Sequence, residues 1–323
     1  MTAVRFPRGV FTLSLDFELI WGTLDLFGPD GFRDACLRER AGVVDRLLAL
    51  LVEHGISATW LTVGHLMLER CAGPAHPDIV RPAHAWSRGD WFAEDPGGEE
   101  ATAPLFFARS LIERIRACPV PQEIGGHSFA HVIYGDPGCS RAAAESDLDA
   151  LVAAAAGMGL SLESFSFPRN RVGHQDALAP RGFKVFRAPE PGWHFEARSP
   201  LVRRLGHLAD VVLARRPPAV FPRREADGLV SVPGSMIYFP MHGLRRFLPV
   251  SVRVRRARKG LAAAVRERGI FHLWTHPTNL ADETEAMFGG LAAILAQVAD
   301  LRAQGRLDVR TLGSLRPPGE DAA

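Results

Sequence analysis

The feature of this sequence that most constrains its fold is the alternation of two kinds of segment along the chain. Short apolar or β-branched runs are separated by longer segments in which apolar residues recur with a helical period. Parallel strands need long connections, which are usually helices, so this alternation predicts an α/β fold with a parallel sheet. Its regularity across residues 1–323 favours one domain, a distorted (β/α) barrel of about seven parallel strands.

The boundaries of these elements can be read from the same pattern. The segments with strand character are 10–16, 58–63, 123–128, 162–167, 184–188, 229–233, 270–275 and 307–311. The clearest helical segments are 37–54, 141–158 and 285–303, and each is followed by a glycine, namely Gly55, Gly159 and Gly305. Because glycine readily adopts the left-handed conformation that ends many helices, these positions predict where the helices stop.

Two stretches interrupt the alternation. Residues 72–105 combine several prolines and glycines with the aromatics Trp86 and Trp91 and show neither period, which predicts an insertion that is either a functional lid or disordered filler. Residues 244–259 are rich in arginine. This basic segment is either a solvated face or a contact for an anionic substrate or a membrane surface.

Composition excludes several classes of protein. With 47% hydrophobic residues, a chain of 323 residues can bury a large core. The balance of 38 basic and 36 acidic side chains argues against a nucleic-acid partner. The four cysteines form no C-x-x-C pair, so they are predicted to be buried thiols. Neither a secretory hydrophobic region nor an apolar run of transmembrane length is evident, so we expect a cytoplasmic protein.

The first segment with chemical content is the polar face of the first predicted strand. Strand alternation places Thr12, Ser14, Asp16 and Glu18 on one face and leaves apolar residues on the other. Buried carboxylates are costly unless they have partners. Ordinary ion pairs and a metal ion are both suitable partners, and the D-x-E pattern alone does not choose between them.

The second segment follows another predicted strand and carries two histidines. His127 and His131 lie four residues apart after a pair of glycines, so on a helical turn they would share a face. Two imidazoles and one carboxylate from a different strand end form a facial site for a divalent ion, with positions left open for water and substrate. The other histidines lack ligand spacing to one another and are assigned no role: His54, His65, His76, His84, His174, His194, His207 and His242.

Together these motifs resemble those of the polysaccharide deacetylases, the NodB-homology fold or family four carbohydrate esterases. Ser14-Leu15-Asp16-Phe17-Glu18 resembles the first motif of the family, in the variant with one residue between the acids. His127-Ser128-Phe129-Ala130-His131 resembles the second motif. The resemblance covers nearly the whole chain. It implies that Asp16 is the catalytic base and that Glu18, His127 and His131 bind a divalent metal, most plausibly Zn²⁺.

Two further motifs of this family have weaker matches. Phe167-Pro168-Arg169-Asn170-Arg171 is similar to the third, with proline and arginine transposed, which implies that Arg169, or else Arg171, orients the base. The segment 271–277 is similar to the last, and it places His276 at the carboxyl end of a strand as the catalytic acid. The aspartate and tryptophan of the fourth motif have no match in 228–233, so His276 lacks an expected partner.

The function that this resemblance implies is removal of an N-acetyl group from an amino sugar in a polysaccharide or in its nucleotide- or lipid-linked precursor. Trp274, Trp86 and Trp91 are the aromatics expected to pack on the sugar. The basic segment would suit phosphates of such a precursor, or peripheral contact with an anionic membrane. Two other functions fit the same fold: a metal amidohydrolase acting on a non-sugar amide or ureide, and a non-catalytic carbohydrate-binding relative.

Overall fold

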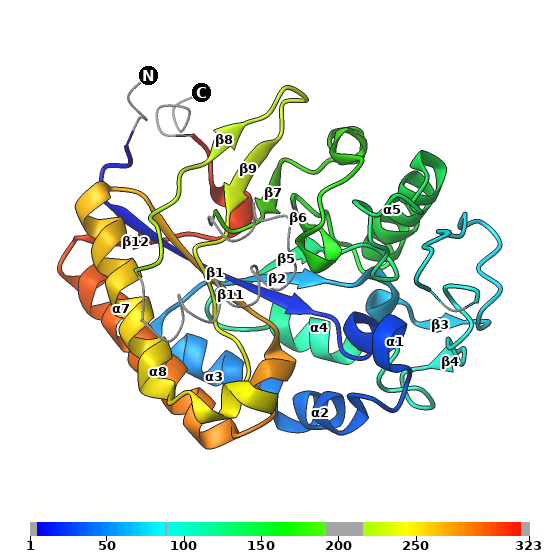
Figure 1. The fold of residues 1–323 in the computed structure, drawn as a ribbon, viewed down its shortest axis with the longest axis horizontal. Helices are drawn as coiled ribbons and strands as arrows, with labels where there is room; N and C mark the ends of the chain where they lie inside the picture. The colour runs from blue at the N-terminus through cyan, green and yellow to red at the C-terminus, as the bar shows by residue number, and fades with distance from the viewer. Residues whose placement is uncertain (1–4, 88, 192–215, 318–323) are drawn as a thin grey trace.

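The computed structural model describes residues 5–87, 89–191 and 216–317. Its main sheet has the strand order β10-β11-β1-β2-β5-β6-β7-β9-β8, and β12 also pairs with β1. These strands are β1 (Gly9–Phe17), β2 (Thr59–Thr62), β5 (Glu123–Gly126), β6 (Ser164–Ser166), β7 (Val185–Ala188), β8 (Arg223–Arg224), β9 (Val230–Pro233), β10 (Met236–Ile237), β11 (Ile270–Thr275) and β12 (Leu307–Val309). All pair in parallel except β8, which is antiparallel to β9. The sheet curls into a half-barrel, which confirms the predicted α/β class (Figure 1).

Helices connect and cover these strands, as the alternation predicted. The α-helices are α1 (Trp21–Phe27), α2 (Arg33–Arg38), α3 (Val44–His54), α4 (Arg109–Arg116), α5 (Arg141–Ala156), α7 (Val250–Glu267) and α8 (Thr284–Ala303). A π-helical turn, η1 (Glu39–Val43), joins α2 to α3. Short 3₁₀ segments are η2 (Gly64–Met67), η3 (Pro168–Asn170), η4 (Gln175–Ala177), η5 (Ala179–Arg181), η6 (Gly243–Phe247), η7 (Pro277–Leu280) and η8 (Leu312–Ser314).

The central strand β1 is buried along its whole length, between β11 and β2. Such strands are usually apolar on both faces. In β1, however, alternate residues are polar, and Ser14 and Asp16 are buried beside the apolar Leu13 and Leu15. The polar side chains of β1 therefore lie in the buried interior, where each needs a hydrogen-bond or charge partner.

Helix α8 corrects one expectation from the sequence. It is long and apolar enough to meet a length-and-composition criterion for a transmembrane helix, although no such segment was expected. In this fold it packs against α7 and α3, and Figure 1 shows these helices together on one flank of the sheet. Its apolar residues Phe288, Leu291 and Ile294 belong to the main hydrophobic core, and 44% of its apolar window is buried.

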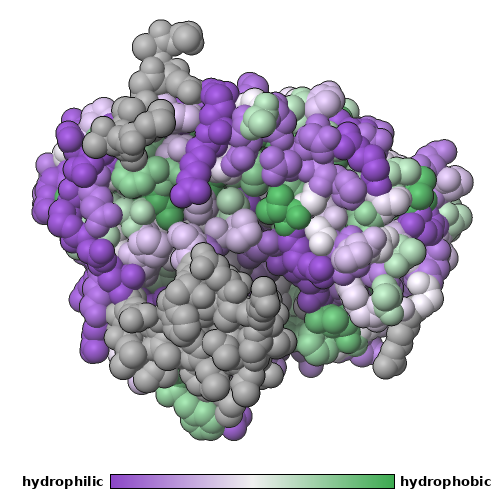
Figure 2. Space-filling view, turned by 45° about the horizontal axis from the view of Figure 1, so that its top comes forward, coloured by the Kyte–Doolittle hydropathy of each residue, from purple (hydrophilic) through white to green (hydrophobic). Residues whose placement is uncertain are grey.

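The basic segment 244–259 divides into buried and exposed residues. Arg253 is fully buried, and its guanidinium donates to the carbonyl oxygens of Phe239, Pro240 and Leu248 at 2.7 to 3.2 Å. Arg253 thus provides hydrogen bonds to backbone carbonyls of the segment before α7. It belongs neither to a solvated face nor to a contact for an anionic ligand or membrane. Arg255 is exposed. In Figure 2 hydrophilic residues gather along the left-hand edge, the side on which Figure 1 places α7.

The insertion 72–105 has little regular structure, as predicted. Its strand β4 (Gly98–Glu99) pairs antiparallel with β3 (Arg70–Cys71), outside the main sheet. Side chains attach the rest to the barrel. Trp91 donates its indole N–H to the carbonyl of Ala130 at 2.8 Å. The described part of the insertion thus has defined contacts with the barrel, and its role as a lid stays a prediction.

Candidate metal centre and active site

The candidate centre lies where β1 ends and the loop after β5 begins. Glu18 follows β1 directly, and its Oε1 lies 2.8 Å from Nε2 of His127 and 3.4 Å from Nε2 of His131. All three side chains are buried. Their ligand atoms converge within 4.8 Å of one another, so two imidazoles and one carboxylate can reach the same ion.

The two histidines meet through a loop conformation, and the predicted helical turn is wrong. Residues 127–131 form no helix, and Ser128 and His131 have φ of 65° and 57°. Positive φ is rare for residues other than glycine and needs support from the surroundings. In this conformation the Nε2 atoms of both rings still lie 2.8 and 3.4 Å from Glu18 Oε1.

Asp147 of α5 supplies that support. Its buried carboxylate accepts hydrogen bonds from the hydroxyl groups of Ser128 and Tyr134 and from the backbone N–H groups of Phe129 and Ala130. Ser128 Oγ in turn accepts from the N–H of Val132 at 2.8 Å. One side chain thus fixes the whole histidine loop without touching the candidate ion. The D-x-E and H-x-x-x-H motifs gave no signal for it.

The orientation of His127 is set by β6. Its Nδ1 lies 2.8 Å from the carbonyl oxygen of Ser166 and 2.6 Å from the Ser166 hydroxyl. Since a carbonyl can only accept, this contact places a ring hydrogen on Nδ1, and Nε2 is the ring atom that faces Glu18. A backbone carbonyl behind the imidazole is the usual outer contact of a metal-binding histidine.

Asp16 has a different environment, although it lies only two residues from Glu18. Arg187 of β7 donates from both terminal nitrogens to the two Asp16 oxygens, at 2.7 and 2.6 Å. Both side chains are almost fully buried. Burial by itself would raise the pKa of Asp16, but the adjacent guanidinium holds it below its ordinary value. Asp16 is therefore a carboxylate with a fixed orientation.

Arg187 corrects the sequence-based assignment of the orienting arginine. Arg169 donates to Asp25 at 2.6 and 2.7 Å, and Arg171 donates to Asp136 at 2.8 Å, so neither is the bidentate partner of Asp16. Arg169 has positive φ in its turn. An arginine inside an otherwise apolar predicted strand was the available signal, because burial there requires an anion.

Two histidines of the β11 region behave differently. His276 Nε2 lies 3.6 Å from Glu18 Oε1 and 3.7 Å from Asp16 Oδ2, at the edge of the centre. Burial would lower the pKa of His276, but the two carboxylates raise it to about 9. His272 is buried deeper, between the Ser14 hydroxyl and the carbonyl of Pro233, and burial lowers its pKa to about 3. Of these two histidines, His276 is the one whose pKa favours the imidazolium form near neutral pH.

Trp274 contributes to this arrangement as a neighbour of Arg187. The guanidinium lies over its ring at 4.4 Å, and its indole N–H donates to Glu190 at 2.6 Å. Trp274 is 8% exposed, so little of the ring is available to a ligand. Its observed contacts support the Arg187 guanidinium, and the prediction that it packs on a sugar has no direct support here.

A pocket of about 520 Å³ adjoins the histidine loop. Trp86 and Trp91 of the insertion form one side, and Trp21 and Asp25 of α1 form another. The Arg169 guanidinium lies 6.0 Å from the Trp86 ring. The insertion therefore contributes to the wall of a cavity next to the histidine loop.

Several solved structures have a similar fold. A protein from Mycobacterium smegmatis, assigned as a polysaccharide deacetylase, superposes with a TM-score of 0.64 at 15% identity, covering 96% of this chain and 91% of that chain. A Pseudomonas aeruginosa PAO1 protein with the same assignment gives 0.54 at 11% identity, over 94% and 87%. The PuuE allantoinase gives 0.60 at 9% identity, also over 94% and 87%. No protein-family model and no curated protein matches the sequence.

The chain has the polysaccharide deacetylase fold. At these identities the likeness concerns the fold and leaves the substrate open. Within the deacetylase fold, Asp16 and Glu18 lie at the carboxyl end of β1 and His127 lies at that of β5, with β2 between these parallel strands. The carboxyl ends of the strands are where α/β barrels hold their reactive groups. The sequence motifs located four groups that the structure brings together, Asp16, Glu18, the histidine pair and His276. They missed Arg187 and Asp147, which orient them.

Proposed function

We propose that this protein is a metal-dependent deacetylase that hydrolyses an N-acetyl group of an amino sugar or a glycan precursor. The observation that carries the proposal is the convergence of Glu18, His127 and His131 beside an ionised, immobilised Asp16. One carboxylate with two imidazoles suits a divalent ion of the Zn²⁺ type and leaves coordination positions for water and substrate. When bound, such an ion would polarise the acyl carbonyl and lower the pKa of water.

The remaining chemistry belongs to residues of the chain. Asp16 would accept the proton of the attacking water, and its bidentate pairing with Arg187 keeps the carboxylate ionised and aimed. His276, which lies within 3.7 Å of both carboxylates, would donate a proton to the departing amine. Its pKa, raised to about 9, keeps it in the protonated form that this role needs.

The pocket beside the histidine loop is the proposed place for the rest of the substrate. Indole rings pack against the apolar faces of sugars, and the Asp25 carboxylate, which lines the pocket and pairs with Arg169, can bind hydroxyl groups. A substrate bound there would lie close to His131, because Ala130, the residue before His131 in the histidine loop, lines the pocket.

An amide or ureide hydrolase acting on a non-sugar substrate is the second candidate, favoured by the similarity in fold to a protein named as an allantoinase. The test is a panel of N-acetylated sugars, their nucleotide-linked forms, O-acetylated sugars and allantoin, assayed with metal-stripped and Zn²⁺-reconstituted protein. Zinc-dependent acetate release from the N-acetylated sugars would support the proposal. Turnover of allantoin alone would replace it with the second candidate, and zinc binding without any turnover would favour a carbohydrate-binding protein.

A further inference from the structure

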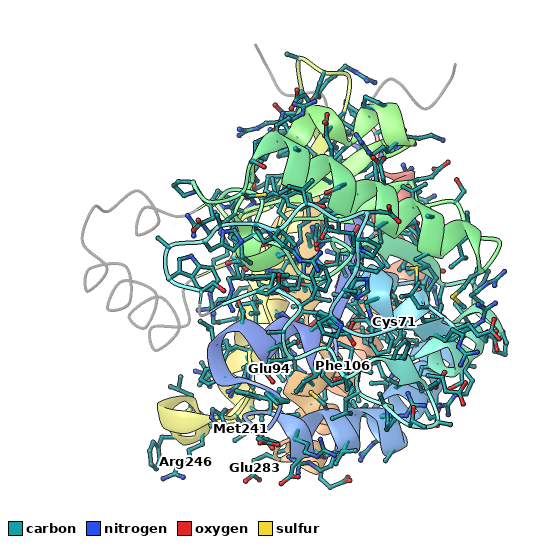
Figure 3. All side chains as sticks on the ribbon, turned by 90° about the vertical axis from the view of Figure 1, so that its right-hand side faces the viewer. Cys71, Glu94, Phe106, Met241, Arg246 and Glu283 are labelled. Atoms are coloured by element: carbon teal, nitrogen blue, oxygen red, sulfur yellow. The ribbon has the colours of Figure 1, made fainter. Side chains whose placement is uncertain are left out.

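A second cluster of metal-ligating side chains lies outside the candidate active site. His65, Cys71, His76 and Asp95 each direct one ligand atom into a region where all four lie within 4.8 Å of one another. His65 belongs to η2, just after β2, whereas Cys71 ends β3 and the other two belong to the insertion. Cys71 is labelled in Figure 3, not far from Phe106 in that view.

The distances resemble those of a four-coordinate site. Asp95 Oδ2 lies 2.7 Å from His76 Nε2, 3.1 Å from His65 Nε2 and 3.3 Å from Cys71 Sγ. Cys71 Sγ lies 3.5 Å from His76 Nε2. Metal–ligand bonds of about 2.0 to 2.3 Å in a tetrahedron separate neighbouring ligands by roughly 3.3 to 3.8 Å. These four separations lie within about 0.6 Å of this range. The other two pairs of ligand atoms lie within 4.8 Å of each other.

Backbone groups already hold three of these side chains in position. The N–H of Gly73 donates to Cys71 Sγ at 3.1 Å, and the N–H of Gly97 donates to Asp95 Oδ1 at 3.0 Å. The Nδ1 of His65 lies 3.0 Å from the carbonyl oxygen of Phe106. Such outer contacts orient metal ligands and stabilise the thiolate and carboxylate forms that bind metal.

The burial of His65 and Asp95 is a further observation in favour of a ligand here. The carbonyl oxygen of Phe106 only accepts, so the hydrogen on His65 Nδ1 points away from the cluster and Nε2 points into it. Nε2 faces the Asp95 carboxylate at 3.1 Å, and both side chains are fully buried. A buried carboxylate that converges with two imidazoles and a thiol is an arrangement that a divalent cation would stabilise.

We propose that these four residues form a structural zinc site. Four protein ligands complete a tetrahedron and leave no open position, as in structural rather than catalytic zinc sites. One thiolate, two imidazoles and one carboxylate match the ligand preference of Zn²⁺. Sequence reasoning treated Cys71 as a buried thiol and gave His65 and His76 no role, because the ligands are separated along the chain and meet only in the fold.

The position of the site indicates what it would do. It joins the insertion, through His76 and Asp95, to the end of β2 through His65. The His65 ring lies 4.6 Å from the ring of Trp21, which lines the pocket beside the histidine loop. Zinc at this site would therefore fix the insertion as a wall of that pocket. This role does not depend on the reaction at the candidate active site.

Cobalt substitution tests the proposal directly, because the candidate active site contains no sulfur ligand. The full-length protein is stripped of metal and reconstituted with Co²⁺, and its absorption spectrum is recorded. We expect the near-ultraviolet sulfur-to-cobalt charge-transfer band of a thiolate ligand, together with intense visible bands of tetrahedral cobalt. The Cys71→Ser protein should lose the charge-transfer band and bind one equivalent less metal, whereas the control Cys118→Ser should keep both.

Two further variants separate this site from the active site. Glu18→Ala should keep the charge-transfer band even though it loses the other equivalent of metal and the activity. If Cys71→Ser does not fold, His76→Ala, at a partly exposed position, is the substitute variant. It should weaken the charge-transfer band. Cobalt-loaded wild-type protein without a charge-transfer band would overturn the proposal, as would equal metal content in the wild-type and Cys71→Ser proteins. Neither result would affect the proposed deacetylase activity.

Discussion

Arg187 and Arg169 provide a comparison at the scale of single residues. Arg187→Ala leaves the buried Asp16 carboxylate unpaired, so the pKa of Asp16 should rise and the free energy of unfolding should fall by about 3 to 5 kcal/mol. Hydrolysis should fall roughly 10²-fold or more, because the base loses its ionised form and its orientation. Arg169→Ala removes a different ion pair, with Asp25, and should change mainly KM. Steady-state kinetics and urea unfolding of both variants check this prediction, and equal kcat losses would contradict it.

His276 gives a second prediction at this scale, concerning pH. Because the pKa of His276 is raised to about 9, the acid is lost as the pH rises through that value, so kcat/KM should decline on the alkaline side. A bound divalent ion offsets the charge of Glu18, so this decline should begin at or below about pH 9. His276→Ala should remove the alkaline limb, lower kcat on an amide by roughly 10² to 10⁴ and keep the metal.

The matched comparison for His276 is an ester with a good leaving group, which needs no proton from the enzyme. Its hydrolysis should suffer much less in His276→Ala than amide hydrolysis does. Equal losses on both substrates, or loss of metal, would show that His276 supports the site only structurally.

At the scale of elements, the histidine loop depends on α5. Asp147→Ala removes the acceptor for four donors of the loop between β5 and α5, including the hydroxyl groups of Ser128 and Tyr134. His131, which has positive φ, should then relax away from Glu18. We expect metal affinity at the active site to fall roughly 10- to 100-fold, although Asp147 is no ligand. Isothermal titration with Zn²⁺ measures this, with Asp149→Ala, on the exposed side of α5, as the control.

The insertion gives the other prediction at this scale. Trp91→Ala removes an aromatic wall of the pocket and the hydrogen bond to Ala130, so KM should rise while metal content stays unchanged. Trp86→Ala should act in the same direction, because Trp86 lines the same pocket. Unaltered kinetics in both variants would remove the insertion from substrate binding.

These elements also show what sequence could and could not predict. The buried strands and their helices follow from local periodicity, and each predicted strand overlaps an observed one. Glu18, His127 and His131 could be found because their spacing matches a metal-ligand pattern. Asp147 could not, because a single acidic residue in a helix has no local pattern that identifies its partner. Arg187 could be noticed as a charged residue in a mostly apolar strand, but that pattern does not identify Asp16 as its partner. The loop that carries His127 and His131 was wrongly expected to be helical, since its conformation depends on hydrogen bonds to a distant helix.

At the scale of the whole molecule, Glu39 couples stability to pH. Burial raises the pKa of this carboxyl to about 8, and Glu18 adds to the rise, although a hydrogen bond from Thr278 opposes it. An acid whose pKa is raised by folding makes the protein less stable as the pH increases from the unfolded value of about 4.3 toward 8. The wild-type protein should therefore lose stability between pH 6 and 8, whereas Glu39→Gln should not. The difference in free energy of unfolding between the two proteins should grow by about 1 to 3 kcal/mol over this range. Urea unfolding at both pH values measures this, and the exposed Glu53→Gln, as control, should show no such change.

The central claim, that Glu18, His127 and His131 hold a catalytic metal, is tested most directly by metal stoichiometry measured together with acetate release. Elemental analysis of the wild-type, Glu18→Ala, His127→Ala and His131→Ala proteins, with the exposed His242→Ala as control, gives the equivalents bound. Each active-site variant should bind one equivalent less than wild type and release no acetate, whereas His242→Ala should match wild type in both. Any of the three variants that retains the wild-type stoichiometry and its activity would contradict the account.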